Sequence, residues 1–218
     1  DRDVTGVQTC ALPIWKDDIE IEYGEITELP TLVLNQEEIP IPPGEEQVPV
    51  DTITDSKGHW AETAINELVE KGIIAGYPNG SFKPDNHISR AEFTSILVKA
   101  IGLNPGGKTG FADLEDHWAR DYIAAATGQG IVSGYSSVRF GPEDNITREQ
   151  MAVMLAKAAR LPALSEKKEF KDNNIISSWA REAVTQVSAN NLITGYPDQT
   201  FRPQNHTTRA EAASVISR

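Results

Sequence analysis

Apolar residues after position 50 recur at helical spacing and divide the chain into short stretches. In the first stretch, Trp60, Ala64, Ile65, Leu68 and Val69 follow the 3.6-residue period of an amphipathic helix. Two later stretches repeat this pattern. The predicted first helices begin at Trp60, Trp118 and Trp179 and end at Gly72, Gly130 and Asn191. Gly and Asn tolerate the left-handed conformation that commonly ends a helix, so these three ends are predicted to be equivalent.

A second helix is predicted after each of the first ones, and each opens on a capping box. A Ser or Thr is followed three positions later by Glu or Gln, so that the two side chains cap the helix start reciprocally. The boxes are Ser89–Glu92, Thr147–Gln150 and Thr208–Glu211. We interpret the Glu and Gln residues as caps rather than ligand contacts. Helices this short cannot bury their apolar faces alone, so the units must pack on one another.

The spacing of Trp, Gly and Arg shows that the chain contains three repeats. Within each unit, 16 residues separate the Trp from a Gly, and 14 separate that Gly from an Arg. The residues concerned are Trp60, Gly76 and Arg90, then Trp118, Gly134 and Arg148, then Trp179, Gly195 and Arg209. Two internal spacings kept in three units are a strong repeat signal.

The residues of these units resemble a known motif. The first unit reads Asp55-Ser-Lys-Gly-His-Trp60-Ala, then Gly72-Ile-Ile-Ala-Gly76-Tyr77-Pro-Asn-Gly80-Ser-Phe82-Lys-Pro84, then Ile88-Ser-Arg90-Ala-Glu92. This pattern resembles the S-layer homology (SLH) repeat, with repeats predicted at 51–103, 111–161 and 170–218. The resemblance implies a mostly α-helical, closed pseudo-threefold domain whose second helices form a central three-helix bundle. It also implies grooves between units that bind an anionic secondary cell-wall polysaccharide, often bearing pyruvate ketals.

The expected function is therefore non-covalent anchoring of a larger, secreted surface protein to the cell wall by a monomeric module. Three departures predict unequal grooves. The second unit has Ser136 in place of the Pro that follows Gly-Tyr in the others, and Gln150 in place of Glu. The third unit has Ser178 where the others have His59 and His117.

The three arginines are the foremost candidates for ligand contact. Each occupies the first position of a second helix, where a cation opposes the helix dipole. A guanidinium beside free helix-terminal amides would form an anion site and could bind a carboxylate with two hydrogen bonds. The alternative is a salt bridge between units. Its expected acidic partners are Asp55, Asp113 and Asp172.

Other candidate ligand-binding residues lie in the loops and at the starts of the first helices. Each loop opens on a Gly, expected in a left-handed turn or a close backbone approach, and a Tyr that either stacks on a sugar or anchors the loop. Lys83 and Arg202 are possible secondary anion contacts, although Gly141 takes their place in the second unit. The tryptophans are interpreted as core anchors, with sugar platforms as the alternative. These candidates are Gly76, Tyr77, Gly134, Tyr135, Gly195, Tyr196, Trp60, Trp118 and Trp179.

The acidic N-terminal part differs from the repeats. It holds 12 of the 32 acidic residues within positions 1–50, and five prolines between Pro30 and Pro49. Residues 15–50 are therefore predicted to be an extended linker or the remnant of an upstream domain. Residues 1–14 include VTGVQTCALPI, which is the translation of a common short-read sequencing adapter. We expect this segment to be an artefact, with an ordinary strand containing a buried Cys10 as the alternative.

Several functional classes are disfavoured by composition. Residues 51–218 are nearly neutral, whereas a nucleic-acid-binding surface is usually basic. No apolar run reaches the roughly 20 residues that span a bilayer. No catalytic set, metal site or cofactor is predicted, and the four histidines fall at repeat-equivalent positions. Two alternatives stay open: an anchoring fragment of a cell-wall or polysaccharide hydrolase, and a calcium-dependent protein-docking module.

Overall fold

The computed structural model describes residues 41–163 and 169–218. The predictions for residues 1–40, including the adapter and Cys10, lie outside the described residues. Within the described part, each repeat contributes two α-helices and no β-strand is formed, as expected for the mostly α fold class. The helices are α1 (Glu62–Glu70), α2 (Arg90–Ala100), α3 (Arg120–Gly128), α4 (Arg148–Ala158), α5 (Arg181–Ala189) and α6 (Arg209–Ile216).

The first helix of each repeat begins two residues later than the sequence predicts. In the first two repeats, Nδ1 of His59 accepts the N–H of Ala61, and Nδ1 of His117 accepts that of Ala119. These bonds hold a turn before the helix. The predicted ends are confirmed. Gly72, Gly130 and Asn191 have φ angles of 66°, 69° and 58°, in the left-handed region.

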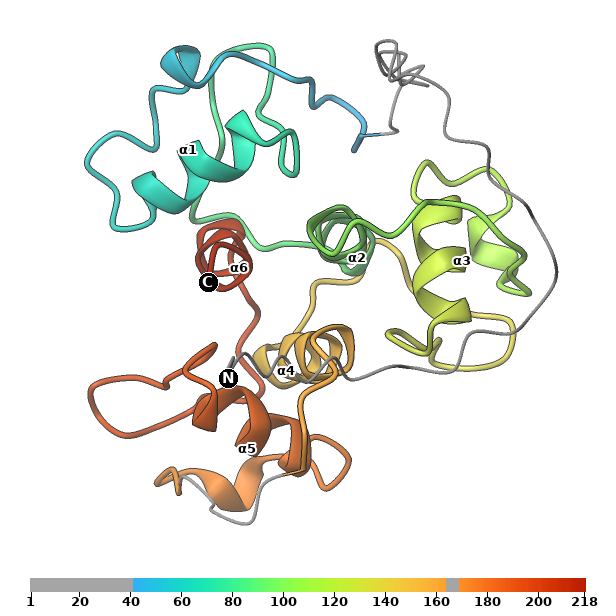
Figure 1. The fold of residues 1–218 in the computed structure, drawn as a ribbon, viewed down its shortest axis with the longest axis vertical. Coiled ribbons are helices and arrows are strands. Elements are labelled where there is room, and N and C mark those ends of the chain that lie inside the picture. Colours follow the sequence, from blue (N-terminus) through green and yellow to red (C-terminus); the bar gives the residue numbers. More distant parts are fainter. Residues whose placement is uncertain (1–40, 164–168) are drawn as a thin grey trace, which may run out of the picture. The chain divides into compact units, whose positions relative to one another are not determined.

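The second helices begin at the three arginines, and all three predicted capping boxes are present. These helices, α2, α4 and α6, lie together at the centre, and α1, α3 and α5 surround them (Figure 1). Each outer helix packs on the central helix of the preceding repeat: α3 on α2, α5 on α4, and α1 on α6. Each repeat therefore covers the central helix of a neighbour, and α2, α4 and α6 form the expected central bundle.

Three backbone hydrogen bonds close the arrangement into a ring. The N–H of Ile88 donates to Thr207 O at 3.0 Å, Thr207 N–H donates to Ile146 O at 3.0 Å, and Ile146 N–H donates to Ile88 O at 3.1 Å. These residues directly precede the capping residues of α2, α4 and α6. Because each donates to one neighbour and accepts from the other, the repeats form a closed pseudo-threefold domain.

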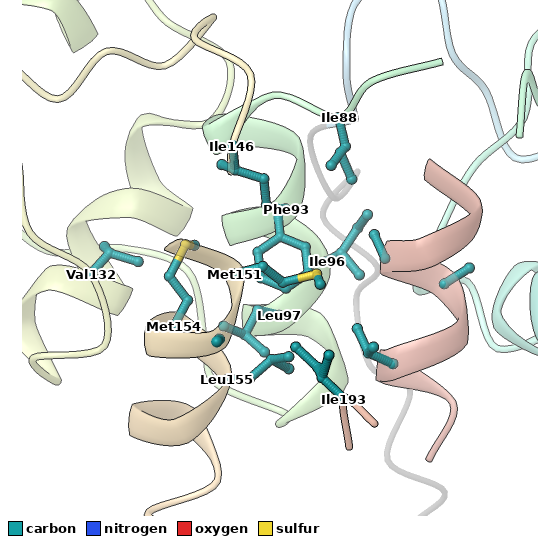
Figure 2. Close-up of a cluster of buried hydrophobic side chains, with 14 of the residues drawn as sticks. Ile88, Phe93, Ile96, Leu97, Val132, Ile146, Met151, Met154, Leu155 and Ile193 are labelled. Atoms are coloured by element: carbon teal, nitrogen blue, oxygen red, sulfur yellow. The ribbon is translucent and has the colours of Figure 1, made fainter. Parts of the chain in front are cut away.

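The central bundle buries one apolar cluster among α2, α4 and α6. Phe93 and Met151, three residues after their arginines, are fully buried and lie close together (Figure 2). The third repeat places Ala212 at the equivalent position, also fully buried. One aromatic, one thioether and one methyl side chain thus fill the space near the axis, and their unequal volumes make the symmetry approximate. None of the described helices is long and apolar enough to cross a membrane.

The segment from residue 41 to 50, assigned to the linker by composition, lies against the first repeat. Its backbone pairs at Glu46, whose N–H donates to Gly76 O at 2.9 Å. Val48 and Val50 pack on the hydrophobic core. Part of the predicted linker thus contributes to the packing of the first repeat.

Candidate functional site

Each predicted arginine lies at the boundary between its own repeat and the next one, and pockets are present beside Arg90 and Arg209. We call these boundaries the first groove (Arg90, repeats one and two), the second groove (Arg148, repeats two and three) and the third groove (Arg209, repeats three and one). The arginines are only 6%, 8% and 2% exposed. In each groove the guanidinium faces the Tyr and Phe of the next repeat's loop, within cation–π distance of both rings.

The helix-terminal amides beside the arginines are occupied, which corrects the expectation that they are free to bind an anion. In the first groove, Arg90 N–H donates to Asp144 O and Ala91 N–H donates to Pro142 O, both at 2.9 Å. Equivalent bonds form at the other two helix starts. The third amide of each helix is capped by the Ser or Thr of its own box. Any anion bound here must therefore rely on side-chain cations.

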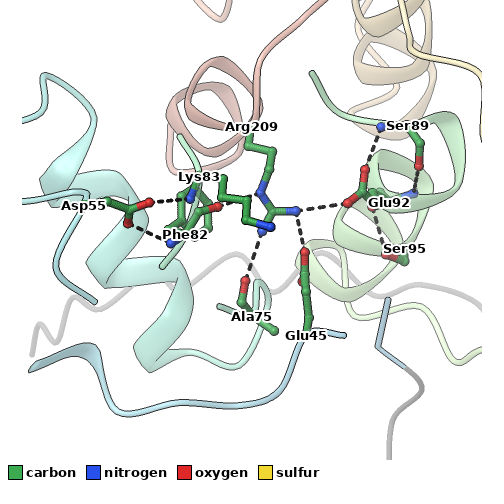
Figure 3. A network of polar contacts seen from close by, with 9 residues as sticks. All are labelled: Glu45, Asp55, Ala75, Phe82, Lys83, Ser89, Glu92, Ser95 and Arg209. Atoms are coloured by element: carbon green, nitrogen blue, oxygen red, sulfur yellow. Dashed lines mark hydrogen bonds and ion pairs between the residues drawn. The ribbon is translucent and has the colours of Figure 1, made fainter. Parts of the chain in front are cut away.

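Arg209 in the third groove has the most partners (Figure 3). Its Nε donates to Phe82 O at 2.9 Å and its Nη2 to Ala75 O at 3.1 Å. Its Nη1 forms ion pairs with Glu92, at 3.0 Å, and with Glu45 from the N-terminal segment. Glu45 is only 8% exposed, and this burial raises its pKa to about 7 despite the nearby guanidinium.

Arg148 in the second groove has one acidic partner. Its Nη1 donates to Glu211 Oε1 at 3.2 Å, and the same oxygen accepts the hydroxyl of Tyr196 at 2.9 Å. The guanidinium carbon lies 4.8 Å from the centre of the Tyr196 ring. Arginine, glutamate and tyrosine thus form a closed set of contacts across the boundary between the second and third repeats.

Arg90 in the first groove forms no ion pair with any residue of the described part. Its Nε donates to Phe140 O at 3.1 Å and its Nη2 to Ser133 O at 2.9 Å, but both acceptors are neutral. Gln150 occupies the position that Glu92 and Glu211 hold in the other grooves. Burial of the unpaired cation lowers the pKa of Arg90. An open cavity of about 370 Å³ lies beside it, and its lining includes Tyr135 and Lys157.

The three aspartates expected to pair with the arginines have a different role. In the second repeat, Asp113 accepts the backbone N–H groups of Phe140 and Gly141, at 3.0 and 2.7 Å. Asp55 and Asp172 hold the equivalent amides of their own repeats. The predicted salt bridges to these residues are therefore wrong. The carboxylates fix the loops that carry the tyrosines, and the ionic partners of the arginines are glutamates instead.

The tyrosines of the Gly-Tyr loops lie beside the groove arginines, and Gly134 and Tyr135 line the first groove. Gly195 has a φ of 81°, whereas Gly76 and Gly134 are sites of close approach. A Cβ on Gly134 would lie about 2.5 Å from Arg139 O, so only glycine fits. Lys83 lies over Tyr77, at 3.7 Å from the ring centre, and Arg202 lies over Tyr196, at 3.9 Å. Arg202 also pairs with Asp198 at 2.9 Å.

The prediction that the tryptophans anchor the core is wrong for two of the three. Trp60 is 64% exposed and Trp179 is 57% exposed, whereas Trp118 is partly buried against the core. Helix periodicity suggested core positions, but the helices begin after these residues, so their side chains do not follow the buried stripe. Trp179 belongs to the third repeat, and its side chain lines the cavity of the first groove. The exposed ring of Trp179 could therefore stack on a sugar, which is the alternative role expected from the sequence.

Sequence analysis missed a second set of cations. Lys99, Lys157 and Arg218 each lie nine residues after a groove arginine. Lys99 lines the third groove and Lys157 the first. The repeat offset was visible in the sequence, but a lysine near a helix end is ordinarily explained by the helix dipole. Within residues 41–163 and 169–218, no three His, Cys, Asp or Glu side chains gather closely enough to hold a metal ion.

The described residues thus form a closed ring of three helical pairs, with an arginine between each pair of repeats. The sequence pattern of the S-layer homology domain matches residues 52–94, 110–152 and 169–213. The chain therefore belongs to the S-layer homology family. Its membership indicates a secreted protein of the cell surface or cell wall.

Curated relatives carry similar regions within much longer chains. The chain is 38% identical over 157 residues to a cellulosome-anchoring protein of Acetivibrio thermocellus, covering 67% of this chain and 35% of the relative. It is 35% identical over 166 residues to an endoglucanase of Bacillus sp. (strain KSM-635), covering 74% and 18%. The surface-layer 125 kDa protein of Lysinibacillus sphaericus is 34% identical over 163 residues, covering 73% and 14%. The chain thus spans about a third or less of these relatives.

Proposed function

We propose that the chain anchors a surface protein by binding the carboxylates of an anionic cell-wall polysaccharide in the grooves between its repeats. Pyruvate ketals are the carboxylates that the family resemblance favours. The observation that carries the proposal is Arg90, a buried guanidinium without a carboxylate partner in the described structure, beside an open cavity. A buried charge without a counter-ion is costly, so a carboxylate from outside would gain a strong interaction there.

The lining of the first groove suits an acidic sugar. Lys157 supplies a second cation on the cavity wall, and Tyr135 and Trp179 supply aromatic surfaces. A charged hydrogen bond contributes roughly 1.5–3 kcal/mol, whereas micromolar binding needs about 8 kcal/mol. Contacts between the sugar and the aromatic walls must therefore add to the ion pair. Several grooves on one polymer would add avidity.

The grooves are expected to contribute unequally. Among the described residues, no glutamate pairs with the arginine of the first groove, whereas the second groove contains Glu211 and the third contains Glu92 and Glu45. Each internal carboxylate satisfies part of the guanidinium's charge and repels an incoming anion. We therefore infer that the first groove binds most strongly and the third most weakly.

The test uses the 218-residue chain and cell walls purified from Lysinibacillus sphaericus, before and after mild acid removal of pyruvate. Arg90→Ala should weaken wall binding about ten-fold or more, because it removes the unpaired cation. Arg90→Lys should restore only part of the binding, since a point charge lacks the planar guanidinium fork. The matched control is Arg139→Ala, which removes an arginine that is largely exposed beside the same tyrosine.

Three outcomes would contradict this function. If Arg90→Ala, Arg148→Ala and Arg209→Ala combined leave binding unchanged in a chain that still folds by circular dichroism, the arginines do not recognise the polymer. Equal binding to walls with and without pyruvate would exclude the ketal as the recognised group. Loss of binding on addition of a chelator would favour the calcium-dependent alternative.

The parent protein is expected to be longer than the repeats. The endoglucanase and the exoglucanase XynX of Acetivibrio thermocellus both match this chain over less than a fifth of their length. A similar arrangement would make the chain the anchoring region of a polysaccharide hydrolase. The activity would then belong to another region of that protein.

A further inference from the structure

The first and third grooves are built from equivalent positions, yet only the first is open. Several wall residues of one have a counterpart in the other, including Arg90 with Arg209, Gln150 with Glu92 and Lys157 with Lys99. The cavity measures about 370 Å³ in the first groove and about 10 Å³ in the third. The third groove differs because Pro42 and Glu45 of the N-terminal segment also line it.

Glu45 reaches the third groove through a turn that the segment makes against the first repeat. The N–H of Glu45 donates to Pro42 O at 3.0 Å, and the next residue, Glu46, bonds to Gly76 O. This turn directs the Glu45 carboxylate at the Arg209 guanidinium (Figure 3). Counting side-chain atoms alone, both residues are only 3% exposed. Glu46 itself is exposed, so two adjacent glutamates of one segment have opposite environments.

The position of Glu45 is therefore that of a carboxylate ligand. Its carboxyl group lines the third groove together with Arg209, from one repeat, and Lys99, from the next, and the groove is nearly closed where the first groove stays open beside Arg90. We propose that Glu45 occupies the carboxylate site of the third groove as an intrachain ligand, and that this groove accepts an external carboxylate only after residues 41–48 leave it. The inference that Glu45 competes with the wall polymer rests on the proposed function. The inference that Glu45 occupies the site does not.

Few contacts hold this segment, so its release is feasible without unfolding the repeats. Beyond the ion pair, the described bonds from residues 41–48 to the first repeat are the Glu46–Gly76 hydrogen bond and the packing of Val48 beside Gly76. The family pattern begins at residue 52, beyond this segment. The segment thus acts as a removable occupant of a groove that the repeats form by themselves.

The experiment titrates sodium pyruvate, a free carboxylate, into the full chain and into Glu45→Ala. The readout is the ¹⁵N-resolved Nε–Hε signal of Arg209, a group that is protected because it donates to Phe82 O. In Glu45→Ala, this signal should shift saturably at millimolar pyruvate, and in the wild type it should not. Glu46→Ala is the matched control and should behave like the wild type. Glu45→Ala/Arg209→Lys lacks this signal, so its binding is followed at the backbone amide of Phe82 and compared with Glu45→Ala followed at the same amide. The double variant should bind pyruvate at least several-fold more weakly.

Two results would overturn the proposal. Equal responses of Arg209 in the wild type and in Glu45→Ala would show that Glu45 does not compete. No response in either protein would show that the vacated position is not a carboxylate site. A parallel wall-binding assay separates the proposed function: Glu45→Ala should bind walls more strongly than the wild type. If neither protein binds walls, the proposed function fails, while the pyruvate titration still decides whether Glu45 occupies the site.

Discussion

Arg209 Nη1 lies 3.0 Å from Glu92 Oε1, and this ion pair joins the last helix of the chain to the first central helix. Glu92 has a second role, because its other oxygen accepts the N–H of Ser89 in the capping box. The Glu92 carboxylate thus caps its own helix and also holds Arg209 of the third repeat in position. In the second repeat, Gln150 keeps the cap without the charge.

This double role predicts different costs for equivalent substitutions. Glu92→Ala removes a cap and one partner of a buried ion pair, and should lower the free energy of unfolding by about 2–3 kcal/mol. Gln150→Ala removes only the cap and should cost about 1 kcal/mol. Glu92→Gln keeps the cap but removes the charge, so its loss in free energy of unfolding should lie between the other two. Urea unfolding measures all three, and equal costs for Glu92→Ala and Gln150→Ala would contradict the role of the ion pair.

Gly134→Ala is expected to destabilise the second repeat. The added Cβ would collide with the Phe111 ring and with the carbonyl oxygen of Arg139, and a backbone atom cannot move aside cheaply. Overpacking of this kind typically costs about 1–3 kcal/mol. Gly128→Ala is the control, because open space surrounds that position and it lies in a helix, where Ala is favoured. Thermal unfolding should separate the two, and an unchanged melting temperature for Gly134→Ala would refute the predicted collision.

Trp179→Ala should weaken wall binding with little effect on stability. The side chain is 57% exposed and lines the first groove, so its removal takes away aromatic surface without emptying the core. We expect a loss of about three- to ten-fold, in the range of a single aromatic contact. Trp60→Ala, at 64% exposure on the first repeat, is compared in parallel. A large drop in melting temperature for Trp179→Ala would instead favour a structural role.

The docking equilibrium of residues 41–48 in the third groove should depend on pH. Burial raises the pKa of Glu45 from 4.5 to about 7, although Arg209 and Lys99 oppose the shift, and the neighbouring charge of Glu92 adds to it. Tyr77, which faces the same cluster, has its own pKa raised by burial and does not ionise near neutrality. The docked segment therefore binds a proton more tightly than the released one. Docking is most favoured below pH 4.5 and weakens as the pH rises from 4.5 to about 7.

Hydrogen exchange at the Glu46 amide measures this effect, because that N–H is bonded to Gly76 only when the segment is docked. After correction for the intrinsic rate, its protection should fall as the pH rises from about 5 to about 7 and level off above that. In Glu45→Gln the protection should be independent of pH over this range, because no carboxyl group remains to titrate there. Protection that rises with pH in the wild type would reverse the assigned direction.

Much of the fold could be predicted because it depends on local rules. Capping boxes, a left-handed Gly or Asn and a 3.6-residue period are properties of neighbouring residues, and they gave the helix ends. The central positions of α2, α4 and α6 were implied by the resemblance to the S-layer homology repeat. The groove arginines were found in the same way as the helix ends. Their burial could not be predicted, because it depends on distant positions. The next repeat's loop supplies carbonyls and aromatic rings, and the glutamates come from α2, α6 and the N-terminal segment.

The errors have the same origin. The amides at the central helix starts looked free because their acceptors, such as Asp144 O, belong to another repeat. Asp113 looked like an ionic partner because its two amide donors, 27 and 28 residues away, are not apparent from the sequence. Glu45 lay in a segment whose composition predicted a linker. In each case a contact between distant residues decided the role.

The ring formed by Ile88, Ile146 and Thr207 also determines how the domain comes apart. In an open array of repeats, a terminal repeat can unfold while the rest persists. Here each repeat donates one bond of the ring and accepts another, and its outer helix packs on a neighbour's central helix. Loss of any repeat therefore exposes both of the others. Unfolding should be a single cooperative transition, and a polymer bound in one groove would protect all three repeats from denaturation at once.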